Sequence, residues 1–168
     1  MKLEEAGALA DRIVHCIEDL CDRIQVAGST RRRRPEVNDI DMVLIPQHMM
    51  WTSIVQRIKD QFKAKVVLGG QQLVRMHVPQ SLPPVPELIV QVDLYRATYE
   101  TWGTLLLIRT GSIDHNIMMC SRAQKMGMML SASDGVIKDA KVIASRTEEE
   151  IFKALEMDFI PPEKREIQ

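Results

Sequence analysis

Two stretches of this sequence alternate like strands of a sheet but carry acidic side chains on one face, and this pattern limits the fold more than any other feature. In residues 39–45, the two-residue period of a strand puts Asp39 and Asp41 on the same face, with apolar residues on the other. In residues 88–95 it puts Asp93 on one face and leaves an unbroken apolar face of Leu88, Val90, Val92 and Leu94. If the two strands are neighbours, three carboxylates converge and raise one another's pKa unless cations neutralise them.

The periodicity of the whole chain predicts an α/β protein with a mixed sheet. Helical spacing covers residues 3–24, 49–62, 98–108 and 114–126, and a last helix follows the N-cap Thr147 and runs to about residue 157. Strands are expected at residues 24–29, 39–45, 88–95, twice within 65–78 around Gly69-Gly70, and in a hairpin of 128–131 with 136–143. The proline-rich residues 80–87 indicate a loop. The pattern changes near Tyr99, so we expect a strand-rich subdomain at 1–99 and a smaller helix-plus-hairpin subdomain at 100–168.

The composition excludes several classes of protein. The chain has 168 residues, of which 45% are apolar, enough to fill the core of one domain or two small lobes. The 22 basic and 23 acidic residues leave a net charge of -1, so a nucleic-acid site must be a local patch. The three cysteines lack C-x-x-C spacing, and no apolar run approaches the roughly 20 residues that cross a bilayer. We expect an intracellular protein, in the cytoplasm or nucleoid, that is not secreted and binds no membrane.

A Gly-Ser pair precedes the first acidic strand and changes what its carboxylates indicate. Taken alone, Asp39 and Asp41 fit the solvent-exposed end of a strand as well as they fit a cation site. Gly28-Ser29 lies shortly before them, after an apolar run. A glycine lets backbone N–H groups approach phosphates, a serine adds a hydroxyl, and carboxylates hold the Mg²⁺ or Mn²⁺ that bridges those phosphates.

Several separate segments resemble DNA polymerase family X, a branch of the nucleotidyltransferase superfamily that contains DNA polymerase beta. These are Gly28-Ser29-Thr30-Arg31-Arg32, Asp39-Ile40-Asp41, Val92-Asp93-Leu94, the stretch from Thr110-Gly111-Ser112 to His115-Asn116, Glu150-Ile151-Phe152, and the tail at residues 160–165. The likeness covers residues 24–165. It implies a nucleotidyltransferase palm followed by a small thumb.

The resemblance also implies a role for each matching residue. Asp39 and Asp41 would ligate two Mg²⁺ ions, which Mn²⁺ can replace, and Asp93 would ligate the catalytic ion beside the primer 3′-hydroxyl. Gly28, Ser29 and Arg32 would hold the triphosphate. Gly111 and Asn116 would line the sugar and base of the nucleotide. Arg33 and Arg34 fit a solvated basic turn equally well, and His115 is expected to be a structural neighbour of Asn116.

The sequence departs from the family pattern in two places. Family X members commonly carry a Tyr-Phe pair before Thr-Gly-Ser that bears on sugar selection, and Ile108 and Arg109 stand there. A basic residue usual on the following helix falls on Cys120. The choice between deoxyribose and ribose is therefore open, and fidelity is expected to be low.

The leading hypothesis is a metal-dependent DNA polymerase that fills short gaps during repair, with nucleoside triphosphates and gapped or primer-template DNA as partners. Whether a protein partner supplies further DNA binding is left open. One alternative is a small nucleotidyltransferase that acts on RNA, protein or a small molecule. The second is a non-catalytic module that binds a nucleotide or a DNA end.

Overall fold

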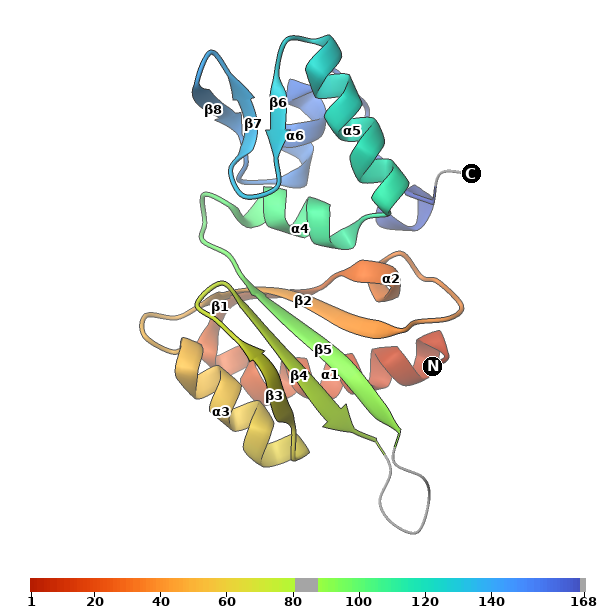
Figure 1. Cartoon of the computed structure of the whole chain (residues 1–168), viewed down its shortest axis with the longest axis vertical. Helices are drawn as coiled ribbons and strands as arrows, with labels where there is room; N and C mark the ends of the chain where they lie inside the picture. The colour runs from red at the N-terminus through yellow and green to blue at the C-terminus, as the bar shows by residue number, and fades with distance from the viewer. Residues whose placement is uncertain (81–87, 167–168) are drawn as a thin grey trace.

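The central sheet combines parallel and antiparallel strands, as the alternating patterns predict. The computed structural model describes residues 1–80 and 88–166, and its larger sheet has the strand order β1-β2-β5-β4-β3 (Figure 1). The strands are β1 (Cys21–Val26), β2 (Asp39–Pro46), β3 (Lys65–Gly69), β4 (Leu73–Pro79) and β5 (Ile89–Arg96). Strands β2 and β5 are parallel, whereas the other neighbouring pairs are antiparallel.

Helices α1 (Leu3–Ile17) and α3 (Trp51–Phe62) cover one face of this sheet (Figure 1). Alternate residues of β2 and β5 point into the core beneath these helices, namely Ile40, Met42, Leu44, Val90, Val92 and Leu94. The predicted apolar faces of both strands are therefore confirmed, except that Leu88 lies before β5 and is 54% exposed. The acidic residues are left on the other face of the sheet.

The prediction of one helix over residues 3–24 is wrong beyond Ile17. A short 3-10 turn, η1 (Glu18–Leu20), follows α1, and β1 begins at Cys21, which pairs with Pro46 of β2. The apolar spacing around Ile24 fits a helix locally, but pairing with a distant strand decides the backbone. The predicted strand to residue 29 also ends early, because Gly28 opens the four-residue helix α2 (Gly28–Arg31).

The second lobe combines three helices with a small sheet. Its elements are α4 (Trp102–Thr110), α5 (Ile113–Lys125), β6 (Met129–Ser131), β7 (Gly135–Lys138), β8 (Lys141–Ala144), α6 (Glu148–Ala154) and the 3-10 turn η2 (Pro162–Lys164). The Thr147 hydroxyl accepts a hydrogen bond from the Glu150 N–H at 3.1 Å, which confirms the predicted N-cap, although the helix ends at Ala154 rather than near residue 157.

The predicted hairpin is a three-stranded sheet. Its second arm, residues 136–143, is broken at Asp139 and Ala140, whose φ values of 50° and 60° form a tight turn. Two left-handed residues suit such a turn, but the segment lacks the glycine or asparagine that usually signals it. The predicted loop at 80–87 falls almost wholly on residues 81–87, outside the described residues.

Helix α4 joins the two lobes. Leu106 packs with Val43, Ile45 and Tyr95 on the acidic face of the larger sheet, while Leu107 faces the core of the second lobe. The upper lobe therefore lies over the face of the sheet that carries the acids, with α4 above β2 (Figure 1).

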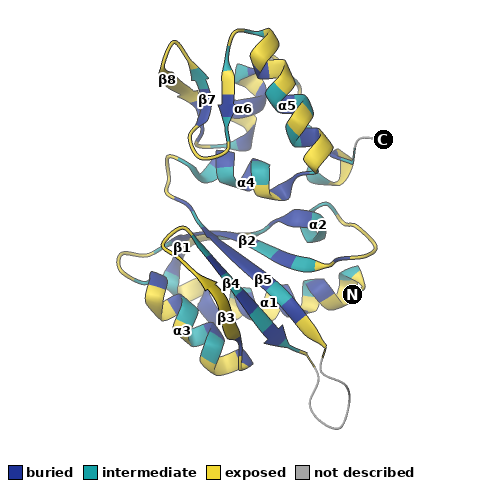
Figure 2. Ribbon diagram, in the orientation of Figure 1, coloured by how far each residue is buried: buried dark blue, intermediate teal, exposed yellow. Residues whose placement is uncertain are grey.

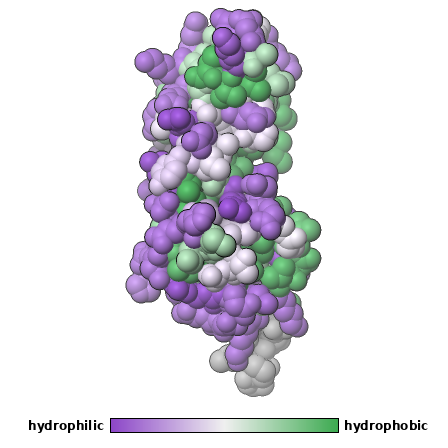
Figure 3. All heavy atoms as spheres, turned by 90° about the vertical axis from the view of Figure 1, so that its left-hand side faces the viewer, coloured by the Kyte–Doolittle hydropathy of each residue, from purple (hydrophilic) through white to green (hydrophobic). Residues whose placement is uncertain are grey.

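Burial is uneven across the two sheets. All five residues of β3 are exposed, and Figure 2 shows the strand in yellow at the edge of the larger sheet. Met129, Val142 and Ile143 of the second lobe are also exposed, and the upper part of the molecule in Figure 3 shows hydrophobic surface among polar atoms. Among the described residues, no helix is long and apolar enough to cross a bilayer.

Candidate active site

The two acid-bearing strands are neighbours, which is the condition for the carboxylates to converge. Strands β2 and β5 run parallel in a register that sets Asp41 beside Asp93 and Asp39 beside Gln91. Parallel neighbours lie about 4.8 Å apart, so the carboxylates of Asp41 and Asp93 share one short stretch of the same face.

A cavity of about 450 Å³ opens over this stretch, between the sheet and the second lobe. Seven of the eight residues predicted from the sequence line it: Gly28, Ser29, Arg32, Asp39, Asp41, Gly111 and Asn116. They come from α2, β2, the link between α4 and α5, and the first turns of α5, so the structure brings together segments about 80 residues apart. Asp93 does not line the cavity.

Gly28 is required by its surroundings. Its φ of +59° lies in the left-handed region that favours glycine. A Cβ at this position would overlap Oδ2 of Asp41. The absent side chain therefore lets the Asp41 carboxylate pack directly against the Gly28 backbone.

Asp41 sits in an environment that disfavours its charge. Burial, followed by the negative charges of Asp39 and Asp93, raises its pKa to about 6. A hydrogen bond from Tyr95 and the charge of Arg109 act in the opposite direction but are outweighed. Asp41 therefore binds a proton more readily than an isolated aspartate would.

Asp93 is held by a partner that sequence reasoning missed. Arg75 of β4 donates from Nε to Oδ1 at 2.8 Å and from Nη2 to Oδ2 at 2.7 Å. The Tyr95 hydroxyl lies 3.3 Å from Oδ2, and Asp93 is only 2% exposed. Strand alternation in residues 73–79 places Arg75 on the polar face of β4, but the register that sets it opposite Asp93 is a tertiary property.

The first two arginines of the basic run bind acidic residues of the second lobe. Arg31 donates to both carboxylate oxygens of Glu148, at 2.9 and 2.7 Å. Arg32, predicted to hold phosphate, donates from Nε to Glu166 at 2.6 Å and from Nη1 to the Thr110 carbonyl. Arg32 thus lines the cavity while its guanidinium is paired with a tail carboxylate.

The Gly-Ser segment between α4 and α5 shapes the other wall. Gly111 has a φ of +72°, and the Gly111–Ser112 peptide bond is cis. Asn116 donates from Nδ2 to the Ile108 carbonyl at 2.9 Å. Among the described residues, nothing hydrogen-bonds its buried Oδ1. Asn116 lines the cavity, but this oxygen is inaccessible to solvent.

Two further residues, His115 and Arg109, lie close to the predicted site residues. His115 is fully buried, as its expected structural role requires, and burial and then Arg165 lower its pKa to about 4. Arg109, singled out from the sequence only as a departure from the family, lies 4.2 Å from the centre of the Tyr95 ring and lines the cavity. Arg109 thus adds a positive charge close to Asp41.

The donor set fits a hard divalent cation in part. Asp39 and Asp41 offer carboxylate oxygens to the cavity, which are the ligands that Mg²⁺ and Mn²⁺ prefer. In the described part of the chain, no group of three His, Cys, Asp or Glu side chains is arranged to hold a metal ion. At the third carboxylate, both oxygens of Asp93 accept hydrogen bonds from Arg75.

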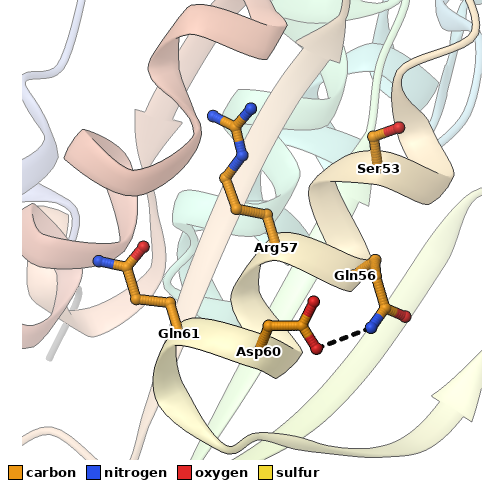
Figure 4. A pocket seen from close by; sticks show the side chains of 5 residues that line it. All are labelled: Ser53, Gln56, Arg57, Asp60 and Gln61. Atoms are coloured by element: carbon orange, nitrogen blue, oxygen red, sulfur yellow. Dashed lines mark hydrogen bonds between the residues drawn. The ribbon is translucent and has the colours of Figure 1, made fainter.

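A larger hollow of about 620 Å³ lies along α3. Gln56 donates to Asp60 at 2.8 Å (Figure 4), and Arg57 donates to the Cys16 carbonyl of α1 at 3.1 Å. This hollow lies on the face of the sheet opposite the carboxylates, so the smaller cavity is the candidate active site.

Comparison with known proteins agrees with this geometry. The family model of the DNA polymerase beta thumb matches residues 105–166. Over 142 residues the chain is 30% identical to the DNA polymerase/3′-5′ exonuclease PolX of Bacillus subtilis (strain 168). That alignment covers 83% of this chain, which spans only 24% of the length of the relative.

The mixed sheet and the second lobe over its acidic strands make this a protein of the polymerase beta-like palm-and-thumb class. The thumb match and the PolX relative show, more narrowly, that the chain is similar to DNA polymerases of family X.

Proposed function

We propose that this protein transfers a nucleotide from a nucleoside triphosphate to the 3′-hydroxyl of a DNA primer, and that its substrate is a short gap in DNA under repair. The observation that carries this proposal is the single cavity in which seven residues of separate motifs meet, beside the paired acids of β2 and β5. In this proposal residues 1–99 act as the palm and residues 100–168 as the thumb. The reaction takes place inside the cell, because DNA and nucleoside triphosphates are found there.

Each wall of the cavity suits one part of a bound nucleotide. Asp39 and Asp41 would hold two Mg²⁺ ions, which, when bound, supply charge neutralisation at the triphosphate and a lowered pKa of the primer hydroxyl. Ser29 would hydrogen-bond a phosphate oxygen, and the glycine at position 28 would let backbone N–H groups approach the phosphate. Asn116 lines the same cavity and would contact the sugar and base.

Two residues have to exchange partners for this chemistry. Arg32 would release Glu166 and donate to phosphate oxygens, which are equally good acceptors for a guanidinium. Asp93 would release Arg75, join the catalytic ion and accept the proton of the primer hydroxyl.

Primer extension tests the proposal. The substrates are a one-nucleotide gap, an open primer-template and a single strand, each with Mg²⁺ or Mn²⁺. We expect template-directed addition that is strongest on the gap and is lost in Asp93→Ala, which still binds the triphosphate because Asp39 and Asp41 remain. Asp60→Ala, an exposed carboxylate on α3, is the matched control and should stay active.

Other outcomes point to the other functions. Addition that persists in Asp93→Ala contradicts the assignment of the third carboxylate. No addition on any DNA substrate contradicts the polymerase proposal and favours a transferase with another acceptor or a non-catalytic module.

A further inference from the structure

An ion pair between Arg75 of β4 and Asp93 of β5 engages the carboxylate that the proposed chemistry requires as a metal ligand. Arg75 and Asp93 are directly opposite in the antiparallel β4–β5 register. The two hydrogen bonds of 2.8 and 2.7 Å run from adjacent guanidinium nitrogens to separate carboxylate oxygens, the paired geometry in which arginine binds carboxylate best.

Both oxygens of the Asp93 carboxylate accept hydrogen bonds. Besides Arg75, the Tyr95 hydroxyl lies 3.3 Å and the Gln91 Nε2 3.5 Å from Oδ2. Since a metal ion binds through the same oxygen lone pairs, a cation at Asp93 would have to displace the guanidinium or lie close to its positive charge.

Arg75 has a route away from this position. Its side chain is 37% exposed, whereas that of Asp93 is 2% exposed, so a rotation of Arg75 leads into solvent while Asp93 keeps its place. Tyr95 still reaches Oδ2 after such a rotation, because it belongs to the same strand as Asp93. The movable member of the pair is therefore the cation.

We propose that Arg75 is a positioning residue that holds Asp93 in its rotamer and competes with a divalent cation for it, so that Asp93 joins the metal site only when the guanidinium turns outward. The inference rests on the proposed function for the role of Asp93. The competition itself concerns binding and can be measured without any nucleotide transfer.

Titration of the full chain with Mn²⁺, followed by the electron paramagnetic resonance signal of the free ion, tests the competition. Arg75→Gln removes the charge and keeps a polar side chain, and we expect it to bind Mn²⁺ on the order of tenfold more tightly than the wild type. Arg75→Lys keeps the charge but loses the paired geometry, so its affinity should lie between the two. Arg57→Gln breaks the ion pair between Arg57 of α3 and Asp19 of η1 and should leave Mn²⁺ affinity unchanged.

A second pair of variants separates competition at Asp93 from a general gain in negative charge. In the Asp93→Asn background, Arg75→Gln should no longer increase Mn²⁺ affinity. If the gain persists there, it comes through Asp39 and Asp41 and the proposal is wrong. Unchanged or weaker binding by Arg75→Gln also overturns it.

Two readouts keep the result independent of folding and of the proposed function. If Arg75→Gln does not fold, the comparison of Arg75→Lys with the wild type decides, and equal affinities of these two overturn the proposal. If the wild type fails in primer extension while Arg75→Gln gains Mn²⁺ affinity through Asp93, the proposed function is wrong and the competition stands.

Discussion

Replacement of Glu148 by alanine tests the buried network that joins the two lobes. Glu148 is the first residue of α6 and is 5% exposed. It accepts two hydrogen bonds from Arg31 and one of 2.6 Å from Arg165, whose side chain is completely buried. Glu148→Ala therefore leaves a buried guanidinium without its countercharge.

The expected loss is large for a single substitution. Removal of one partner from a buried ion pair costs about 3–5 kcal/mol, because the remaining charge is stranded. For a protein of this size, that corresponds to a fall in Tm of roughly 6 to 20 °C. Urea denaturation at pH 7, with thermal melting as a second probe, measures the change. Glu149→Ala in the same helical turn is the control, because this exposed side chain should contribute less than about 1 kcal/mol.

The pH dependence of this loss has a definite sign. Burial by itself would raise the pKa of Glu148, but hydrogen bonds from Arg31 and the charge of Arg165 outweigh it and hold the pKa below its ordinary value. The stabilisation is therefore complete above pH 5 and disappears as the pH falls through the pKa of the folded protein. A difference below about 1 kcal/mol at pH 7, or one that grows in acid, would refute the reasoning.

Three further substitutions test individual side chains. The pKa of Asp41 is raised to about 6, so its ionisation destabilises the folded state above that pH. Asp41→Asn should therefore stabilise the protein by roughly 3 kcal/mol at pH 8 and have little effect at pH 3. Urea denaturation at the two pH values measures the difference. The pKa of His115 is lowered to about 4, so the wild type should lose stability as the pH falls from 6.5 to 4, and His115→Leu should lose less over the same range. Gly28→Ala should cost about 1–2 kcal/mol of backbone strain and weaken triphosphate binding by displacing Asp41, whereas Gly7→Ala, in open space on α1, should not destabilise.

The residue pattern alone was enough to predict which side chains share a face and which segments contain the candidate site residues. The alternation in β2 and β5 put Asp39, Asp41 and Asp93 on the face away from the main core, and the structure has this arrangement. The N-cap at Thr147 was equally readable, because its hydrogen bond spans only three residues. Such features depend on the repeat of one strand or the first turn of one helix.

Features that depend on distant partners were decided only by the tertiary structure. The last residues of the helix predicted to residue 24 form β1 instead, because Cys21 and its neighbours pair with β2. Arg32 is bound by Glu166, which is 134 residues away, and Arg75 meets Asp93 only through the β4–β5 register. A periodic pattern predicts which face of its own strand or helix a side chain lies on. Which charged group lies next to that side chain depends on the packing of the whole chain.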